Sequence, residues 1–305
     1  VPDGPAGIAD ELRRVGAAAE TVGVSDLSVM DHWFQMEAMW PVTDPMMEGY
    51  TTLAFLAAHT ETVRLGLLVT GVTYRHPGLL AKIVTTLDVV SAGRAILGIG
   101  AAWNEDEHKA YGYEFPPVAE RFERLEDTLR ICAAMFSAEP APSYDGRRHS
   151  IAGALNNPKP VRGRVPILVG GSGERRTLRL VAEYADACNL FGDLDTIRHK
   201  LDVLERHCAD VGRDPAEITR TKLASLVVGR TVEEARAAAE EAFRSRGEMA
   251  AVFLGATLIG DTDSIGEQVA AHRAAGLDGL IVNLPLVDDL DQVRAAGEVM
   301  AKALA

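Results

Sequence analysis

Short apolar runs alternate with amphipathic helical runs along this 305-residue chain, and this alternation constrains the fold more than any other feature. Runs of this kind are typical of strands that are buried on both faces in a parallel sheet. The pattern predicts seven strands, at Leu27–Met30, Arg64–Thr70, Ala95–Gly100, Pro166–Gly170, Ala187–Phe191, Thr221–Val228 and Gly279–Asn283. Strands that alternate with helices build either a closed barrel or a doubly wound sheet.

Helical stripes fill the stretches between these strands. Apolar residues recur at helical spacing over 79–87, 122–136 and 197–211, and a further helix is expected over 6–22, ahead of the first strand. Seven strands are one fewer than an eight-stranded barrel needs. We therefore expect residues 1–305 to form a single-domain (β/α)8 TIM barrel whose first strand is missing from this chain. We prefer this fold to a doubly wound sheet.

Two irregular segments interrupt the alternation. The segment of about 138–163 contains Pro140, Pro142, Pro158 and Pro160 and is too long for an ordinary strand–helix connection. We expect it to be an insertion near the active-site mouth. The second, about 229–260, is expected to be helical from Val232 to Arg246, with a lid or a helix after Gly247.

The net charge and the cysteines indicate which classes of partner and which cellular compartment to expect. The net charge of -13 argues against a duplex nucleic acid as partner, and no apolar stretch is long enough to cross a bilayer. Cys132, Cys188 and Cys208 lie among apolar neighbours without a Cys-x-x-Cys pair. We expect reduced core cysteines in a cytoplasmic protein that acts on a small molecule, with no nucleic-acid or membrane partner.

The first predicted strand ends in Asp31-His32-Trp33-Phe34. Barrels of parallel strands carry their chemistry at the C-terminal strand ends, and an imidazole there can move a proton near neutral pH. The aromatic residues can form a wall against a flat apolar ligand. The alternative is that Asp31 caps the next segment and His32 is only buried.

The run Val169–Thr177 is the best candidate for an anion site. A strand ends, Gly170, Gly171, Ser172 and Gly173 follow, and a helix begins, so that bare amides and the helix dipole can face one phosphate. Arg175 or Arg176 can add a positive charge. The alternative is a glycine-rich turn with a serine cap.

Two more strand ends carry less specific signals. Tyr74, Arg75 and His76 lie either on a ligand-facing loop or in a tight turn before a helix. Gly98-Ile99-Gly100 is a weak dinucleotide motif, since the third glycine is absent, and Trp103 with Asn104 suits an apolar wall with a hydrogen-bonding amide. Glu107 and His108 are adjacent, which is poor spacing for a metal pair, and we expect no metal site.

Together these segments resemble the bacterial luciferase-like family, and in particular its branch that uses the deazaflavin coenzyme F420. The resemblance covers about Ala6 to the C-terminus. It is carried by Met30-Asp31-His32, Leu65-Gly66 through Arg75-His76-Pro77, Leu87-Asp88 with Ser91-Ala92-Gly93-Arg94, Gly98-Ile99-Gly100 through Trp103-Asn104-Glu105, and Gly170-Gly171-Ser172-Gly173.

The resemblance implies a (β/α)8 barrel with a redox ring at its C-terminal mouth, and it assigns cofactor-binding residues. Leu68 and Val69 fall where the family carries a non-prolyl cis peptide that supports one face of the ring. Thr70 and Asn104 fall where side chains contact the cofactor. Gly170, Gly171, Ser172 and Gly173 match the cradle for its phosphate.

The resemblance further implies that His32 is the catalytic acid/base, with Asp31 orienting its loop or tuning it. Trp33, Tyr74 and Trp103 are expected to shape the substrate pocket and exclude water. The predicted activity is hydride transfer between C5 of coenzyme F420 and a small organic substrate, by a homodimer. The alternatives are an FMN-dependent monooxygenase on the same barrel and a catalytically silent flavin-binding barrel.

Overall fold

A computed structural model describes residues 4–36 and 40–304 and contains one curled, parallel main sheet. Its principal strands are neighbours in chain order: β1 (Asp26–Val29), β2 (Arg64–Leu67), β4 (Ala95–Gly100), β7 (Ile167–Gly170), β8 (Ala187–Leu190), β9 (Thr219–Val228) and β11 (Gly279–Asn283). A doubly wound sheet reverses its strand order at a switch point, and this sheet does not. The seven predicted strands and the barrel-type fold are confirmed.

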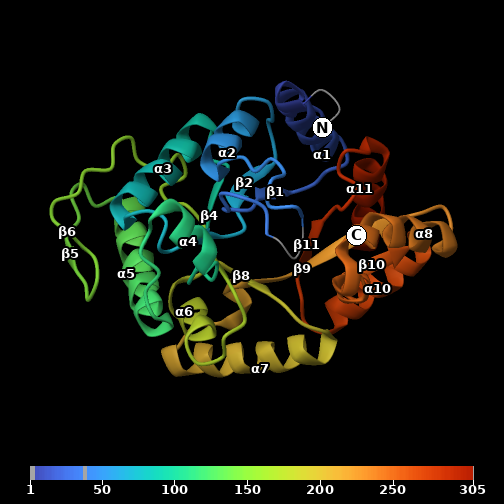
Figure 1. The fold of residues 1–305 in the computed structure, drawn as a ribbon. Helices are drawn as coiled ribbons and strands as arrows, with labels where there is room; N and C mark the ends of the chain where they lie inside the picture. The colour runs from blue at the N-terminus through green and yellow to red at the C-terminus, as the bar shows by residue number, and fades with distance from the viewer. Residues whose placement is uncertain (1–3, 37–39, 305) are drawn as a thin grey trace.

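Helices surround the sheet, as Figure 1 shows. They are α1 (Ile8–Thr21), α2 (Gly49–Ala57), α3 (Pro77–Val90), α4 (Glu105–Tyr111), α5 (Val118–Phe136), α6 (Thr177–Tyr184), α7 (Leu194–Val211), α10 (Thr262–Ala274) and α11 (Leu290–Leu304). Pro77 opens α3, and the Nδ1 atom of His76 accepts the Gly78 N–H at 3.3 Å. A proline fits the first helical position because that amide has no partner inside the helix.

The core lies between the sheet and the helices. Leu65, Leu97, Ile99, Val169 and Leu190 are completely buried. Strands β2 and β4 approach so closely that a Cβ atom on Gly98 would lie 1.9 Å from the Leu67 carbonyl oxygen. Only glycine fits there, which explains its place inside an otherwise apolar strand.

The sheet is open on one side. Strand β1 pairs with β2 and strand β11 with β9, and within the described residues no strand joins β1 to β11. Helices α1 and α11 nevertheless pack together across this side, where a Cβ atom on Gly297 would lie 2.0 Å from Val22 Cγ2.

The first irregular segment forms a hairpin of β5 (Tyr144–Asp145) and β6 (Ser150–Ile151). The hairpin projects beside α5 at the edge of the view in Figure 1. It also reaches the start of α3, where the His149 ring lies 5.3 Å from the ring of His76. That this insertion lies near the active-site mouth stays a prediction. The buried carboxylate of Asp127 in α5 holds the turn, because it accepts the N–H groups of Arg148 at 2.7 Å and His149 at 3.0 Å.

The second irregular segment contains α8 (Val232–Phe243), the 3₁₀ helix η3 (Arg244–Met249), α9 (Ala250–Gly255) and the strand β10 (Thr257–Gly260). The α-helix ends three residues before the expected Arg246, and Gly247 has a φ of 54°, outside the helical region. Strand β10 pairs in parallel with the C-terminal half of β9 and was not predicted. The apolar run 250–258 therefore supplies a short helix and the first half of a strand.

The cysteines are reduced core residues, as expected. Cys132, Cys188 and Cys208 are free and buried, and burial raises the pKa of the Cys132 and Cys188 thiols to about 12. Within the described ranges, no helix combines the length and the apolar character that spanning a bilayer requires.

Candidate active site

His32 and Glu107 form the centre of the candidate site. His32 follows β1, Glu107 lies in the first turn of α4, and the imidazole Nδ1 is 2.8 Å from Glu107 Oε2. A carboxylate can only accept, so Nδ1 carries the hydrogen and donates it, which leaves Nε2 as the nitrogen that can exchange a proton. The His32 side chain is 13% exposed, whereas that of Glu107 is completely buried.

Glu107 is held in its ionised form by three donors. Its carboxylate accepts the Trp33 N–H at 2.7 Å and the Tyr74 hydroxyl at 2.7 Å in addition to the His32 ring. Burial alone would raise the pKa of Glu107, but these hydrogen bonds outweigh burial and hold that pKa below its ordinary value. Burial and the Glu107 carboxylate raise the pKa of Tyr74, so its hydroxyl stays a donor.

Asp31 lies in a second network beside the first. Its carboxylate is buried, accepts the Thr70 hydroxyl, and binds both terminal nitrogens of Arg75, at 2.5 and 3.1 Å. Arg75 also reaches Glu48 at 2.7 Å and lies over the Tyr50 ring. These bonds tie the loop after β1 to the start of α2, while Glu107 and not Asp31 binds the His32 ring.

The break between β2 and β3 (Thr70–Gly71) contains the predicted bulge. A cis peptide bond joins Leu68 and Val69, as the resemblance implied. The Val69 side chain lies against glycines on two neighbouring strands, and a Cβ atom on Gly170 would be 2.9 Å from Val69 Cγ1. Strands β4 and β7 thus contact the bulge through backbone.

The run after β7 has the form of an anion cradle. Gly171 has a φ of 116°, and a Cβ atom on Gly173 would lie 2.8 Å from Thr177 Oγ1, so both positions require glycine. In the described part of the chain, the amides of residues 172–176 have no hydrogen-bond partner. Ser172 Oγ accepts the Phe191 N–H at 3.0 Å, and its own hydrogen remains available. The cradle therefore fits a phosphate group.

Trp103 and Asn104 lie in the loop that joins β4 to α4. The Asn104 side chain caps α4 by accepting the Glu107 N–H at 3.4 Å, and the backbone carbonyl of Asn104 accepts a hydrogen bond from His108 Nδ1 at 2.6 Å. Trp103 is 63% exposed, and its ring is 5.5 Å from that of His32. Trp33 instead packs between neighbouring rings, and Tyr74 is 6% exposed, so Trp103 is the wall residue most open to a ligand.

The structure brings most of the predicted site together but adds one residue that the sequence analysis set aside. Glu107 was considered only as half of a metal pair with His108. Its signal is its position: it lies three residues after Asn104, inside the first turn of the helix that follows β4. No pattern in the sequence connects it to His32, which is 75 residues away.

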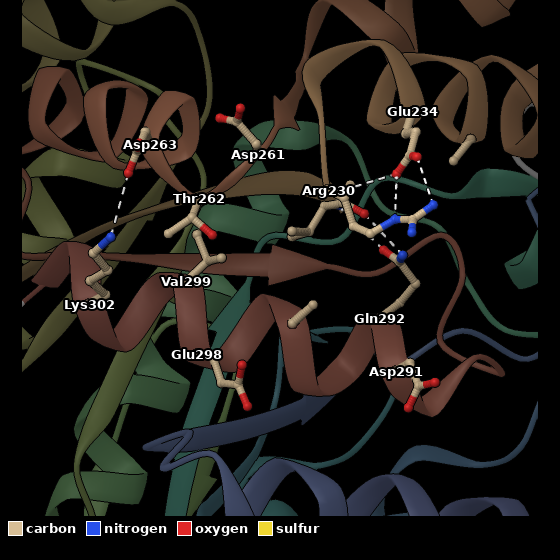
Figure 2. A pocket seen from close by; sticks show the side chains of 14 residues that line it. Arg230, Glu234, Asp261, Thr262, Asp263, Asp291, Gln292, Glu298, Val299 and Lys302 are labelled. Carbon is tan, nitrogen blue, oxygen red and sulfur yellow. Dashed lines mark hydrogen bonds and ion pairs between the residues drawn. The ribbon is translucent and has the colours of Figure 1, made fainter.

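A cavity of about 790 Å³ lies elsewhere, between α8, α10 and α11 at the ends of β9 and β10 (Figure 2). No predicted site residue lines it. Its two cations are paired at the rim, Arg230 with Glu234 at 2.8 Å and Lys302 with Asp263 at 3.5 Å. We therefore place the candidate site at His32, where an acid/base pair, a bulge and a cradle meet.

Comparison with solved structures supports the fold. An F420-dependent secondary alcohol dehydrogenase in complex with an F420-acetone adduct aligns over 96% of this chain and 94% of its own, with a TM-score of 0.81 at 16% identity. A monooxygenase from Streptomyces bottropensis aligns over 97% of this chain and 94% of its own, with a TM-score of 0.80 at 20% identity. At these identities the likeness shows the fold alone.

Curated relatives are more similar in sequence. An F420-dependent glucose-6-phosphate dehydrogenase from Microbacterium testaceum (strain StLB037) is 33% identical over 58% of this chain, and the match spans 51% of that enzyme's length. A phthiodiolone/phenolphthiodiolone dimycocerosates ketoreductase from Mycobacterium sp. (strain JLS) is 30% identical over 75% of this chain and 67% of its own. The profile of the luciferase-like monooxygenase family matches residues 2–296. The chain therefore belongs to the luciferase-like monooxygenase family.

Proposed function

We propose that this protein is an oxidoreductase that moves a hydride between coenzyme F420 and a small organic carbonyl or alcohol. The observation that carries the proposal is the pair of His32 and Glu107, at 2.8 Å. Asp31, directly before His32, accepts the Thr70 hydroxyl beside the bulge, and Val69 of the bulge lies against Gly170 at the start of the cradle. When a carbonyl carbon accepts a hydride, its oxygen must accept a proton, and the reverse reaction must remove one. A histidine held by a buried carboxylate suits this task.

The residues present fit a phosphate-bearing ring cofactor. Gly170, Gly171, Ser172 and Gly173 would hold its phosphate through free amides and one hydroxyl. The backbone of Leu68–Val69 would support the ring, together with Thr70, the next residue, and Asn104 at the start of α4. When bound, a deazaflavin supplies the two-electron hydride chemistry that side chains lack.

The chain supplies the proton and the orientation. Glu107 fixes the His32 ring through Nδ1, so that Nε2 exchanges the proton with the substrate oxygen. Because Glu107 is ionised, it also stabilises the imidazolium that forms when His32 takes up a proton. Trp33 and Tyr74 lie behind this pair and exclude water from it.

A His32→Gln variant tests the proposal. Glutamine can keep a bond to Glu107 but cannot act as an acid or base, so we expect turnover of F420 to fall by about 10²- to 10⁴-fold. The dissociation constant for F420, measured by fluorescence, should stay within about threefold of wild type. Undiminished turnover in this variant would remove His32 from the mechanism and the proposal with it.

An FMN-dependent monooxygenase is the second candidate function. One specific observation favours it: the cradle recognises a phosphate, which FMN also carries, and nothing at the bulge distinguishes the two rings. Oxygen uptake that depends on added reduced FMN and on His32 would support this reading. We rank it second because the curated relative whose name states a cofactor, the glucose-6-phosphate dehydrogenase, is F420-dependent.

A further inference from the structure

The indole of Trp103 remains open beside His32. Trp103 is 63% exposed, and the centroids of its ring and of the His32 ring lie 5.5 Å apart with an interplanar angle of 66°. Tryptophan is highly buried on average because its rings cover a large apolar area. The neighbouring Trp33 instead contacts Tyr74 at 4.4 Å and Tyr113 at 4.8 Å between ring centroids. An open indole next to the proton-exchanging residue is available to a ligand.

Specific contacts hold the indole in this position. Ala102, directly before it, has a φ of 59°, a left-handed conformation that is uncommon without glycine. Arg121 from α5 donates to the carbonyls of Ala101 and Ala102 and lies 4.3 Å over the Phe115 ring. Strained backbone of this kind persists where the surroundings enforce it, and it clusters at ligand sites.

Charge next to the indole selects against anions. Glu105 and Asp106 follow Trp103 by two and three residues and already occupy the first turn of α4, where the helix dipole attracts negative charge. Glu105 is paired with Lys109 at 2.9 Å, and Asp106 is exposed. Arg121 is engaged with the backbone carbonyls. A carboxylate or phosphate bound at this end of α4 would therefore add to the negative charge that the first helical turn already carries.

We infer that the substrate is an uncharged carbonyl or alcohol with an aromatic ring beside the reacting carbon, and that Trp103 selects it by stacking on that ring. This inference rests on the proposed function and names its substrate class. The indole orients the ring, and the adjacent carbonyl oxygen then faces His32. Stacked aromatic pairs are favoured over an aromatic–aliphatic contact of equal area, which supplies the discrimination.

The test compares two ketones that differ only in the aromaticity of one ring. Acetophenone and cyclohexyl methyl ketone are titrated calorimetrically into protein saturated with F420, or with FMN if that is the cofactor it retains. We expect acetophenone to bind about threefold to tenfold more tightly. Trp103→Leu should abolish this preference, whereas Trp103→Phe should keep most of it. 4-Acetylbenzoate, which adds a carboxylate, should bind more weakly than acetophenone.

The control is Leu155→Ala, which shortens another apolar side chain that is 68% exposed and remote from His32 in the chain. It should leave all three affinities unchanged. Equal binding of the two uncharged ketones by the wild type, or a preference that survives Trp103→Leu, overturns the inference. Weaker cofactor binding by Trp103→Leu would assign Trp103 to the cofactor and overturn it as well. Failure to bind F420 while the ketone preference holds would count against the proposed function alone.

Discussion

At the scale of single residues, the account depends on a buried carboxylate that the sequence alone did not reveal. Glu107 receives hydrogen bonds from His32, Trp33 and Tyr74, and its side chain is completely buried. Buried charges persist only when such partners satisfy them. Glu107 therefore links the geometry of the acid/base pair to the stability of the fold around it.

Glu107→Gln tests both roles. Glutamine keeps the shape of the side chain but loses the charge. Its NH2 group would also face hydrogen-bond donors that Glu107 now accepts from. We expect a loss of about 2–3 kcal/mol in the free energy of unfolding and at least a tenfold lower turnover. Urea denaturation and steady-state kinetics measure these effects. Glu105→Gln, an exposed carboxylate on the same helix, should change stability by less than about 0.5 kcal/mol.

The pH dependence of stability has a definite sign at this residue. The folded pKa of Glu107 lies below its ordinary value of 4.5, so the folded protein binds this proton more weakly than the unfolded chain does. The stabilisation is present in full above the ordinary value and is lost as the pH falls through the folded pKa. We expect the wild type to lose more stability than Glu107→Gln on acidification below about pH 5. If the unfolding free energies of wild type and Glu107→Gln fell in parallel with pH, this prediction would be contradicted.

At the scale of elements, the β5–β6 hairpin depends on a buried carboxylate in α5. Asp127 accepts from the Tyr144 hydroxyl and from the turn amides, including those of Arg148 and His149. Burial alone would raise the pKa of Asp127, but these bonds keep it below its ordinary value. A small two-stranded hairpin is at best marginally stable alone, so this anchor decides whether it stays folded.

Asp127→Asn is therefore expected to open the hairpin. The amide nitrogen cannot accept an N–H, and losing such bonds costs about 1–3 kcal/mol locally. Tryptic cleavage after Arg147 and Arg148 should accelerate by about tenfold, as followed by mass spectrometry. Glu126→Gln is the matched control, since Glu126 pairs only with Arg130 on the helix surface. Equal cleavage rates in Asp127→Asn and wild type would refute the anchor.

The strands and helices were largely predictable, because burial on both faces leaves a continuous apolar run and amphipathic helices leave a stripe. Strand β10 was missed, since four residues within an apolar run carry no period that distinguishes a strand from a helix. The β5–β6 hairpin was not predicted, because it depends on tertiary hydrogen bonds to Asp127. The pair of His32 and Glu107 was missed for the same reason, because the loop after β1 and the first turn of α4 meet only in the folded chain.

At the scale of the whole molecule, the predicted homodimer remains open to test. The outer face of α2 and α3 carries a groove of about 210 Å³, lined by Tyr50, Ala54, Lys82, Ile83, Thr86, Leu87 and Val90. Within the described residues, the buried Tyr50 hydroxyl has no hydrogen-bond partner there, and Val90 is 58% exposed. An unsatisfied buried hydroxyl beside exposed apolar residues is more typical of an interface than of a free surface.

We expect light scattering to give twice the chain mass of 32.7 kDa. Ala54→Arg, which places a charge in the groove, should shift the protein to the monomer mass. Val252→Arg, at a 59% exposed position on α9, which packs against α8 and η3, should leave the dimer intact. A monomeric wild type at micromolar concentration would contradict the prediction.

The central claim is that the protein uses coenzyme F420. An equilibrium titration with F420 and FMN side by side tests this claim most directly. The account predicts that F420 binds at least about tenfold more tightly than FMN, a difference of about 1.4 kcal/mol. Gly173→Val, which crowds Thr177 in the cradle, should weaken F420 binding. Tighter binding of FMN, with oxygen uptake and no measurable affinity for F420, would contradict the account.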